Sequence, residues 1–516
     1  MTDPAAPRSV DPGSSAMAWL AALIAALCIT AVLLLNQIGA PAPAPKESIP
    51  AAAAVDPADP VTISAKLVTK LRFSMSEVDA PTRAMLLQQL ENPFVPLERV
   101  SFDEALRKII CTAEILRGEE GTERALRMLE DLAARPGLPP AETPLPLAEP
   151  ERSPDAAARD EALREAQTRE AAARRADLQT LRTIYTQGPE SVSAEDRAAL
   201  IARHAWFAEV ALRFGQPDTD PDRRDLLGGG VLAIVGLTSV VGVMIVAVVA
   251  GLACSLIALI LLLSGKLRPR FVAPAPGGSF GWELLAAFCV CFLAFKIGAE
   301  ILRAATSSAG SIPPWVAGTV LAGQWLVALS IFWPLLRGVS FADYRRLVGW
   351  TAPRGVLREL GAGTFAYLAG LPLVGVALII SLTAHSLYQR LIGAPEGPVQ
   401  NPILELAVGG SFWPLVLIFL LATVWAPLVE ETVFRGGMYR ALRTRLHALL
   451  AGAVSAAAFG VMHGYPFLLL GPVTAIGVVF ALTREWRGSI VGPIFAHFLN
   501  NATILTLVFI IARLVR

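Results

Sequence analysis

Long uncharged apolar runs recur along this chain and restrict its fold more than any other feature. A membrane-spanning helix needs roughly 20 mostly apolar residues to cross about 30 Å of hydrocarbon. The first such run, residues 17–35, contains no charged side chain. Eight further candidate runs lie near residues 231–263, 282–302, 315–336, 363–385, 412–429, 448–463, 467–482 and 490–515. We therefore expect an all-α polytopic membrane protein with about nine transmembrane helices.

The composition divides the chain into two physically different halves. The 516 residues are 54% hydrophobic and only 17% charged, with a formal net charge of +1, which excludes a strongly basic nucleic-acid-binding protein. Residues 38–227 carry 24 Lys and Arg against 32 Asp and Glu, whereas residues 228–516 carry 19 against 9. We expect the lipid bilayer as a partner, with no nucleic acid.

We divide the sequence into four parts. Residues 1–37 are an N-terminal segment with a membrane anchor, for which removal as a signal peptide stays open. Residues 38–227 are a charged soluble helical insert after the first span, and its proline-rich linkers lie at 41–45 and 136–154. A solvated helical spacer explains this insert better than a ligand-binding domain. A transmembrane segment and basic loop (228–280) and a multi-pass domain (281–516) follow.

Basic residues alternate between loops and so predict the membrane topology. They gather near residues 266–270, 337–358, 440–445 and 484–487, and the positive-inside rule places all four loops in the cytoplasm. If residues 231–263 cross once, the insert lies outside and the N-terminus inside. A tight hairpin there would reverse this assignment and give ten spans.

Charged side chains follow directly on the apolar run that ends near residue 429. Glu430 and Glu431 are adjacent, and Arg435 follows four residues after Glu431. Each intramembrane charge costs at least a few kcal/mol, so such residues usually face a cavity or a partner. On a helix Glu431 and Arg435 have the favourable order for an ion pair, while Glu430 points about 100° away. An interfacial position that balances the following basic segment is the alternative interpretation.

Two of the five histidines lie in the apolar C-terminal spans. His463 stands four residues after Phe459, and His497 stands four residues before Asn501, so each pair shares one helix face. A single histidine of this kind is more often bonded between packed helices than catalytic. The two together with the paired acids favour a site.

The order and spacing of these residues resemble the CPBP family of intramembrane proteases, which includes the CaaX prenyl proteases and the bacterial Abi-type proteins. The resemblance covers roughly residues 281–516 and is sharp only from about 425 to 501. The matching motifs are Glu430-Glu431-x-x-x-Arg435, Phe459-x-x-x-His463 and His497-x-x-x-Asn501.

The resemblance implies a hydrolase that cleaves a peptide bond inside the membrane. Glu430 would activate water, His463 would help to orient it, and His497 with Asn501 would stabilise the developing oxyanion. Glu431, Arg435 and Phe459 would support this site. We therefore expect an intramembrane endopeptidase whose substrate is a membrane protein or a lipidated peptide.

The resemblance leaves open whether this protease uses a metal ion. The family is often labelled metalloprotease, and a zinc ion would have Glu430, His463 and His497 as its ligands. A glutamate-and-water mechanism needs no cofactor, and the chain contains neither HExxH nor a paired CxxC. We expect that no cofactor is required.

One geometric difficulty concerns the depth of Glu430 in the membrane. Two straight antiparallel spans at 412–429 and 448–463 would leave Glu430 and His463 on opposite sides. We therefore expect Pro427 to begin a new helix as its first residue, with Glu430 in the first turn of a helix that runs to about Arg445.

Two other classes of function remain as alternatives. The first alternative is a non-catalytic membrane immunity or scaffold protein that keeps the motifs. The second, which has less support, is a proton-coupled transporter. The substrate, the cleavage site and the oligomeric state do not follow from the sequence. The Ala- and Arg-rich composition suggests a bacterial plasma membrane.

Overall fold

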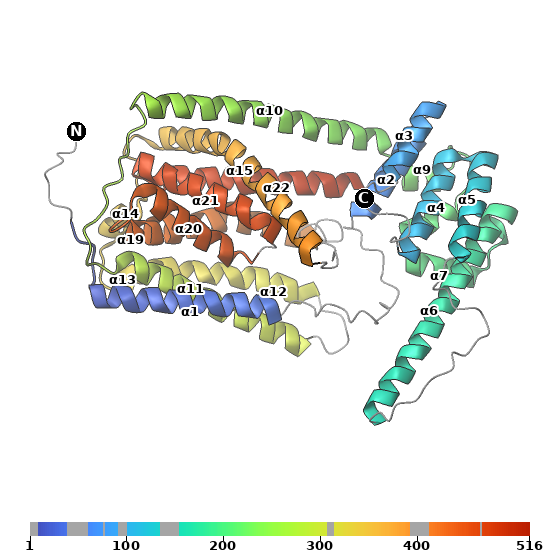
Figure 1. Ribbon diagram of the computed structural model, residues 1–516, viewed down its shortest axis with the longest axis horizontal. Coiled ribbons are helices and arrows are strands. Elements are labelled where there is room, and N and C mark those ends of the chain that lie inside the picture. Colours follow the sequence, from blue (N-terminus) through green and yellow to red (C-terminus); the bar gives the residue numbers. More distant parts are fainter. Residues whose placement is uncertain are drawn as a thin grey trace. The chain divides into compact units, whose positions relative to one another are not determined.

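The fold consists of two compact units of α-helices in a computed structural model (Figure 1). The structure describes residues 9–38, 60–75, 78–90, 101–134, 154–306, 314–392, 412–464 and 467–515. The membrane unit holds the described residues within 1–41, 240–397 and 410–508. The insert unit holds mainly the described residues within 42–239.

The insert unit is helical, as predicted, in the residues that the structure describes. Its helices are α2 (Pro60–Phe73), α3 (Ala80–Leu90), α4 (Phe102–Leu116), α5 (Gly118–Ala133), α6 (Pro154–Gln187), α7 (Ala194–His204), α8 (Trp206–Ala211) and α9 (Pro221–Leu227). They enclose an apolar core that contains Leu106, Ile110 and Phe207. The linkers predicted at 41–45 and 136–154 lie outside the described residues, except that Pro154 begins α6.

The membrane unit contains the remaining helices. In chain order these are α1 (Ser15–Ile38), α10 (Gly230–Leu263, of which residues 240–263 belong here), α11 (Phe280–Thr306), α12 (Pro314–Gln324), the 3₁₀ segment η3 (Trp325–Phe332), α13 (Trp333–Leu336), α14 (Phe341–Val348), α15 (Val356–Ile392), the run from α17 to α19 given below, α20 (Ala448–Met462), α21 (Phe467–Arg487) and α22 (Val491–Val515, of which residues 491–508 belong here). Helix α1 runs alongside α11, and α21 packs against both α15 and α20 (Figure 1).

The predicted fold class is confirmed: this is an all-α, multi-pass membrane protein. Eight helices among the described residues are long and apolar enough to cross a membrane. Helix α20, at the position of another predicted span, is apolar but has only 15 residues. At 1.5 Å per residue it rises about 22 Å, which is short of the roughly 30 Å hydrocarbon core.

Helix α10 is one continuous helix of 34 residues, so the hairpin alternative is wrong. A single crossing, together with the basic loops, predicts that residues 60–227 lie on the outer face. We expect a cysteine introduced at exposed Arg127 to react with a membrane-impermeant maleimide in intact cells, and one introduced at exposed Arg268 to react only after permeabilisation. Labelling of position 127 only after permeabilisation would reverse this topology.

The prediction that Pro427 begins a new helix is wrong. Helical conformation continues through the proline, and the hydrogen-bond register widens on both sides of it. The consecutive segments are α17 (Phe412–Leu420), the π-helical η4 (Leu421–Trp425), α18 (Ala426–Glu430), the π-helical η5 (Glu431–Met438) and α19 (Tyr439–Leu442). The wide turn of η4 precedes the proline ring, which lacks an N–H to donate.

This continuous run resolves the difficulty about depth in a different way. The span does not end near Val429 but continues to Leu442, so Glu430 lies within the span. Glu430 stands about 18 Å before Leu442, and His463 stands about 22 Å after Ala448, which begins the next helix. Both side chains therefore lie at comparable depths from the same basic face.

Glycines allow the helices that carry the site to approach each other closely. A Cβ atom on Gly281 of α11 would lie 2.4 Å from the carbonyl oxygen of Gly437 in η5. A Cβ atom on Gly363 of α15 would lie 2.5 Å from the carbonyl oxygen of Gly492 in α22. These contacts bring α11 against η5 and α15 against α22 at distances that larger residues exclude.

Candidate active site

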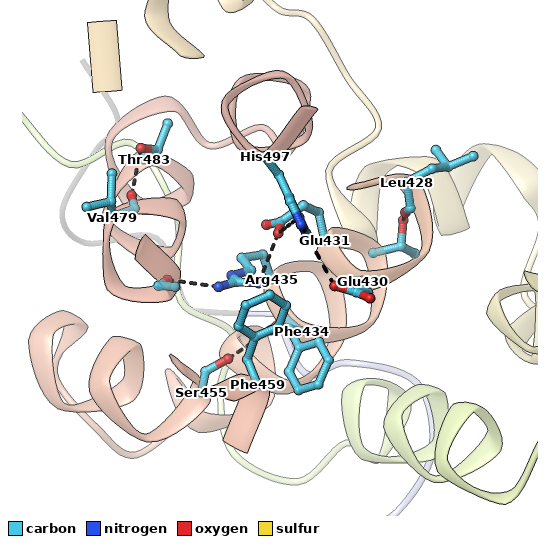
Figure 2. A network of polar contacts seen from close by, with 12 residues as sticks. Leu428, Glu430, Glu431, Phe434, Arg435, Ser455, Phe459, Val479, Thr483 and His497 are labelled. Atoms are coloured by element: carbon cyan, nitrogen blue, oxygen red, sulfur yellow. Dashed lines mark hydrogen bonds and ion pairs between the residues drawn. The ribbon is translucent and has the colours of Figure 1, made fainter. Parts of the chain in front are cut away.

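Glu431 is the centre of a fully buried polar network (Figure 2). Its Oε1 atom accepts hydrogen bonds from Arg435 Nη1 at 2.9 Å and from His497 Nδ1 at 3.0 Å. Glu431 and Arg435 are both 0% exposed. The predicted ion pair is therefore confirmed, and the interfacial interpretation does not hold for Glu431.

Aromatic rings hold the guanidinium group of Arg435. Its centre lies 4.6 Å from the ring of Phe459 and 5.2 Å from that of Phe480, and Nη2 donates to the Gly477 carbonyl at 2.9 Å. The Phe480 ring also stacks on His497, with centroids 5.1 Å apart. Cation–π contacts and charged hydrogen bonds together offset the loss of hydration on burial.

Glu430 faces the two histidines that the sequence singled out. Its Oε2 atom lies 3.9 Å from His463 Nε2 and 3.9 Å from His497 Nε2. This oxygen is buried and has no hydrogen-bond partner among the described residues. The side chains of Glu430 and His463 remain 14% and 24% exposed, respectively. These separations exceed direct hydrogen bonds but are within reach through one bridging water.

In both histidines, the hydrogen bond made by Nδ1 determines the protonation of Nε2, the ring atom that faces Glu430. A carbonyl or carboxylate oxygen only accepts, so His463 Nδ1–H donates to the Phe459 carbonyl at 2.7 Å, and His497 Nδ1–H donates to Glu431. In neutral imidazole each Nε2 is then an acceptor. Glu430 and two Nε2 lone pairs thus converge on one volume, and either histidine donates from Nε2 only after it takes up a proton.

Asn501 lies one turn beyond His497 on α22 and contacts η4. Its Nδ2 donates to the Ala422 carbonyl at 2.8 Å, and Asn500 donates to its Oδ1 at 3.0 Å. Ala422 stands five residues before Pro427, so an i to i−5 bond to this carbonyl would need the N–H that proline lacks. One hydrogen of the Asn501 amide therefore pairs with that carbonyl.

Sequence reasoning missed two groups that hold the site together. Phe480 and Gly477 of α21 contact the buried network, but a phenylalanine and a glycine in an apolar span carry no local signal of such a role. Outside the motifs, Trp350 Nε1 donates to Thr432 Oγ1 at 2.9 Å. This bond connects the segment before α15 to the first turn of η5.

The groups at this site stand farther apart than the ligands of one bound zinc ion do. Among the described residues, no group of three His, Cys, Asp or Glu side chains is arranged to hold a metal ion. Two ligands at 2.0 to 2.2 Å from one tetrahedral zinc stand about 3.4 Å apart, closer than the 3.9 Å between Glu430 Oε2 and either Nε2. We therefore assign no step to a metal ion.

Comparison with known proteins identifies the region that contains this site. Residues 412–503 match the family model described as "Rce1-like: Type II CAAX prenyl endopeptidase Rce1-like". The C-terminal region is therefore similar to this Rce1-like family. Every predicted site residue lies inside the matched range, so the resemblance that the motifs suggested is confirmed for this region.

Two curated bacterial proteins are similar to parts of the chain. "Putative membrane peptidase YdiL" of Bacillus subtilis (strain 168) is 34% identical over 86 residues, which is 16% of this chain and 34% of the relative. "Uncharacterized 24.3 kDa protein" of Escherichia coli is 27% identical over 175 residues, which is 33% of this chain and 73% of the relative. The match to YdiL thus spans only about a third of that relative's length. No solved structure matches the chain at a significant level.

Proposed function

We propose that this protein is an intramembrane endopeptidase that hydrolyses a peptide bond of a membrane-associated substrate. One observation supports this most directly: a half-buried glutamate faces two imidazole nitrogens within a region of the Rce1-like family. The family match and the similarity to a relative named as a membrane peptidase support a peptidase. The residue types supply what hydrolysis needs, which is a base, an orienting group and hydrogen-bond donors.

Glu430 is the general base in this mechanism. A water between Glu430 and His463 Nε2 donates one hydrogen to each, which directs an oxygen lone pair toward the substrate carbonyl carbon. Glu430 takes the proton as the C–O bond forms, and it returns the proton to the leaving amine as the C–N bond breaks. Nδ1 of His463 stays bonded to the Phe459 carbonyl, so the ring keeps its orientation throughout.

His497 and Asn501 are the groups that stabilise the oxyanion. His497 donates from Nε2 only in its protonated form, and its Nδ1–H bond to Glu431 fixes the orientation of the ring. Asn501 has a second amide hydrogen beyond the one bonded to Ala422. Burial strengthens both interactions because bulk water does not screen them.

Purified wild-type protein in lipid vesicles should cleave a membrane peptide that the Asn501→Ala variant cleaves more slowly. Loss of one oxyanion donor is expected to lower kcat by about 10² to 10³. Two substrate sets, a prenylated CaaX peptide and an unmodified transmembrane peptide, test the substrate class by mass spectrometry of the products. Asn500→Ala is the matched control, and we expect it to retain far more activity because it touches the site only through Asn501.

A strong chelator tests the alternative of a catalytic metal in the same assay. Cleavage that persists with the chelator supports the glutamate-and-water mechanism. Cleavage that disappears and returns on addition of zinc would replace it with a metal site at Glu430, His463 and His497. Absence of cleavage of both peptides by wild type would favour the non-catalytic scaffold.

A further inference from the structure

The described residues ahead of α1, 9–14, are bound to other parts of the membrane unit. We call residues 9–14 the N-terminal strap. The Ala275 N–H donates to the Ser9 carbonyl at 3.0 Å, and the Ser279 N–H donates to the Pro12 carbonyl at 3.0 Å. A β-bridge joins Val10 to Ala275. The strap therefore pairs along the segment that leads into α11.

One side chain of the strap reaches the helix that carries the candidate site. Asp11 accepts two hydrogen bonds from Arg440, at 2.8 Å from Nε and 2.7 Å from Nη2. The side chains are only 7% and 10% exposed. Such a bidentate, buried pair is strong and geometrically specific. Arg440 lies in α19, two residues after η5 ends.

The close contact between the strap and the segment before α11 requires glycine at two positions. Gly13 has φ of +99°, and a Cβ atom there would lie 1.7 Å from Ser279 Oγ. A Cβ atom on Gly278 would lie 2.2 Å from the Asp11 carbonyl oxygen. Because no side chain fits at either place, the contact between strap and segment is a close-packed feature of the fold.

The register of η5 explains why this attachment matters for the site. A π-helical segment is rare and less favourable than an α-helix, so it persists only where its surroundings hold it. Glu431 and Arg435 both lie in η5. A return to α-helical register would rotate one end of η5 relative to the other by about 100° for each residue by which the register shifts. Glu431 would then lose His497.

Two clamps hold the end of this segment. One is Asp11 on Arg440, and the other is Glu485, which accepts from Tyr439 Oη at 2.7 Å and from Arg443 Nη2 at 2.9 Å. The second clamp comes from α21, within the family match. The first comes from a segment more than 400 residues earlier, outside that match.

We propose that Asp11 is a positioning residue for the proteolytic site, which it supports by holding Arg440 and thereby the wide register of η5. The proposal rests on the proposed function only for its effect on activity. Helix α1 and the strap are then parts of the proteolytic core rather than a detachable anchor.

Amide hydrogen exchange tests this proposal without any cleavage assay. In the full chain in lipid vesicles, Asp11→Asn should accelerate exchange at residues 431–442 by about tenfold or more, because the freed segment opens more often. Asp11→Glu keeps the charge and should restore slow exchange in part. Asp343→Asn, which breaks an exposed pair with Arg346, is the control and should leave exchange at 431–442 unchanged. Unchanged exchange in Asp11→Asn would overturn the proposal whether or not the protein cleaves any peptide.

The kinetic experiment separates positioning from general stability. At a temperature where all variants are folded, Asp11→Asn should lower kcat by about 10- to 100-fold with KM nearly unchanged, because a displaced base misses its near-attack geometry. Asp11→Glu should recover part of kcat. Faster exchange with an unchanged kcat would assign Asp11 a merely structural role and reject the positioning role.

A second pair of variants tests the strap contact by adding a methyl group instead of removing a charge. Gly13→Ala and Gly265→Ala both place alanine at positive φ, but nothing lies within 4 Å of a Cβ atom on Gly265. Only Gly13→Ala should reproduce the exchange and kcat changes of Asp11→Asn. Equal effects of the two variants would contradict the role of the strap.

Discussion

Replacement of Glu430 by glutamine is expected to reduce peptide cleavage by about 10² to 10⁴ or more, because the amide keeps the size of the side chain but cannot take a proton. The Oε2 atom that faces both histidines at 3.9 Å is the atom that loses its basicity. The measurement is single-turnover cleavage of a membrane peptide in vesicles, with substrate bound before the reaction begins.

The control for this variant is another glutamate in the same unit. Glu300→Gln removes a carboxylate from α11 that pairs with Arg303 at 3.0 Å and is 37% exposed. We expect normal cleavage, since exposed pairs contribute little. Full cleavage by Glu430→Gln would discard Glu430 as the base. Slow cleavage by both variants would point instead to a general effect of lost charge.

The two wide turns connect the fold to the chemistry. They keep one helix continuous from residue 412 to 442 while Glu430 and Glu431 point to different partners. Glu430, whose side chain is 14% exposed, faces His497, whereas Glu431 lies fully buried beside Arg435 (Figure 2). The adjacent carboxylates therefore have separate partners: in the proposed mechanism Glu430 is the reacting group, whereas Glu431 is the counter-ion of Arg435.

Local sequence rules predicted the parts of the site that depend on local spacing. Glu431 and Arg435 stand four apart, so helical geometry pairs them wherever the helix lies. The proximity of Glu430 to His463 and His497 followed only from resemblance to a family, since no spacing rule joins residues on three helices. The family match covers the same residues.

Long-range contacts explain what the sequence did not predict. Pro427 was expected to begin a helix. Instead Asn501, 74 residues later, donates a hydrogen bond to the Ala422 carbonyl and so stabilises a continuous helix with a wide turn. The pair between Asp11 and Arg440 spans 429 residues. Neither partner stands out locally, because an aspartate before an apolar run and an arginine in a basic loop are both ordinary.

Removal of the Glu431 carboxylate alone is expected to produce the largest loss of stability of any single substitution in the site. Glu431→Met leaves the buried guanidinium of Arg435 without its counter-ion, and such uncompensated buried charges cost about 3 to 5 kcal/mol. The double variant Glu431→Met with Arg435→Met replaces both charges by apolar groups and should recover most of that loss, since buried pairs are often no more stabilising than apolar residues of similar size.

Chemical unfolding in mixed micelles measures these differences, with Glu300→Met as the exposed control that should change the free energy of unfolding by less than about 1 kcal/mol. The double variant should remain inactive although it is stable, because His497 no longer has the acceptor that orients Nδ1–H. Two outcomes contradict this account. A stable single variant would mean that Arg435 is adequately compensated by Gly477 and the aromatic rings, and an active double variant would mean that His497 does not need Glu431.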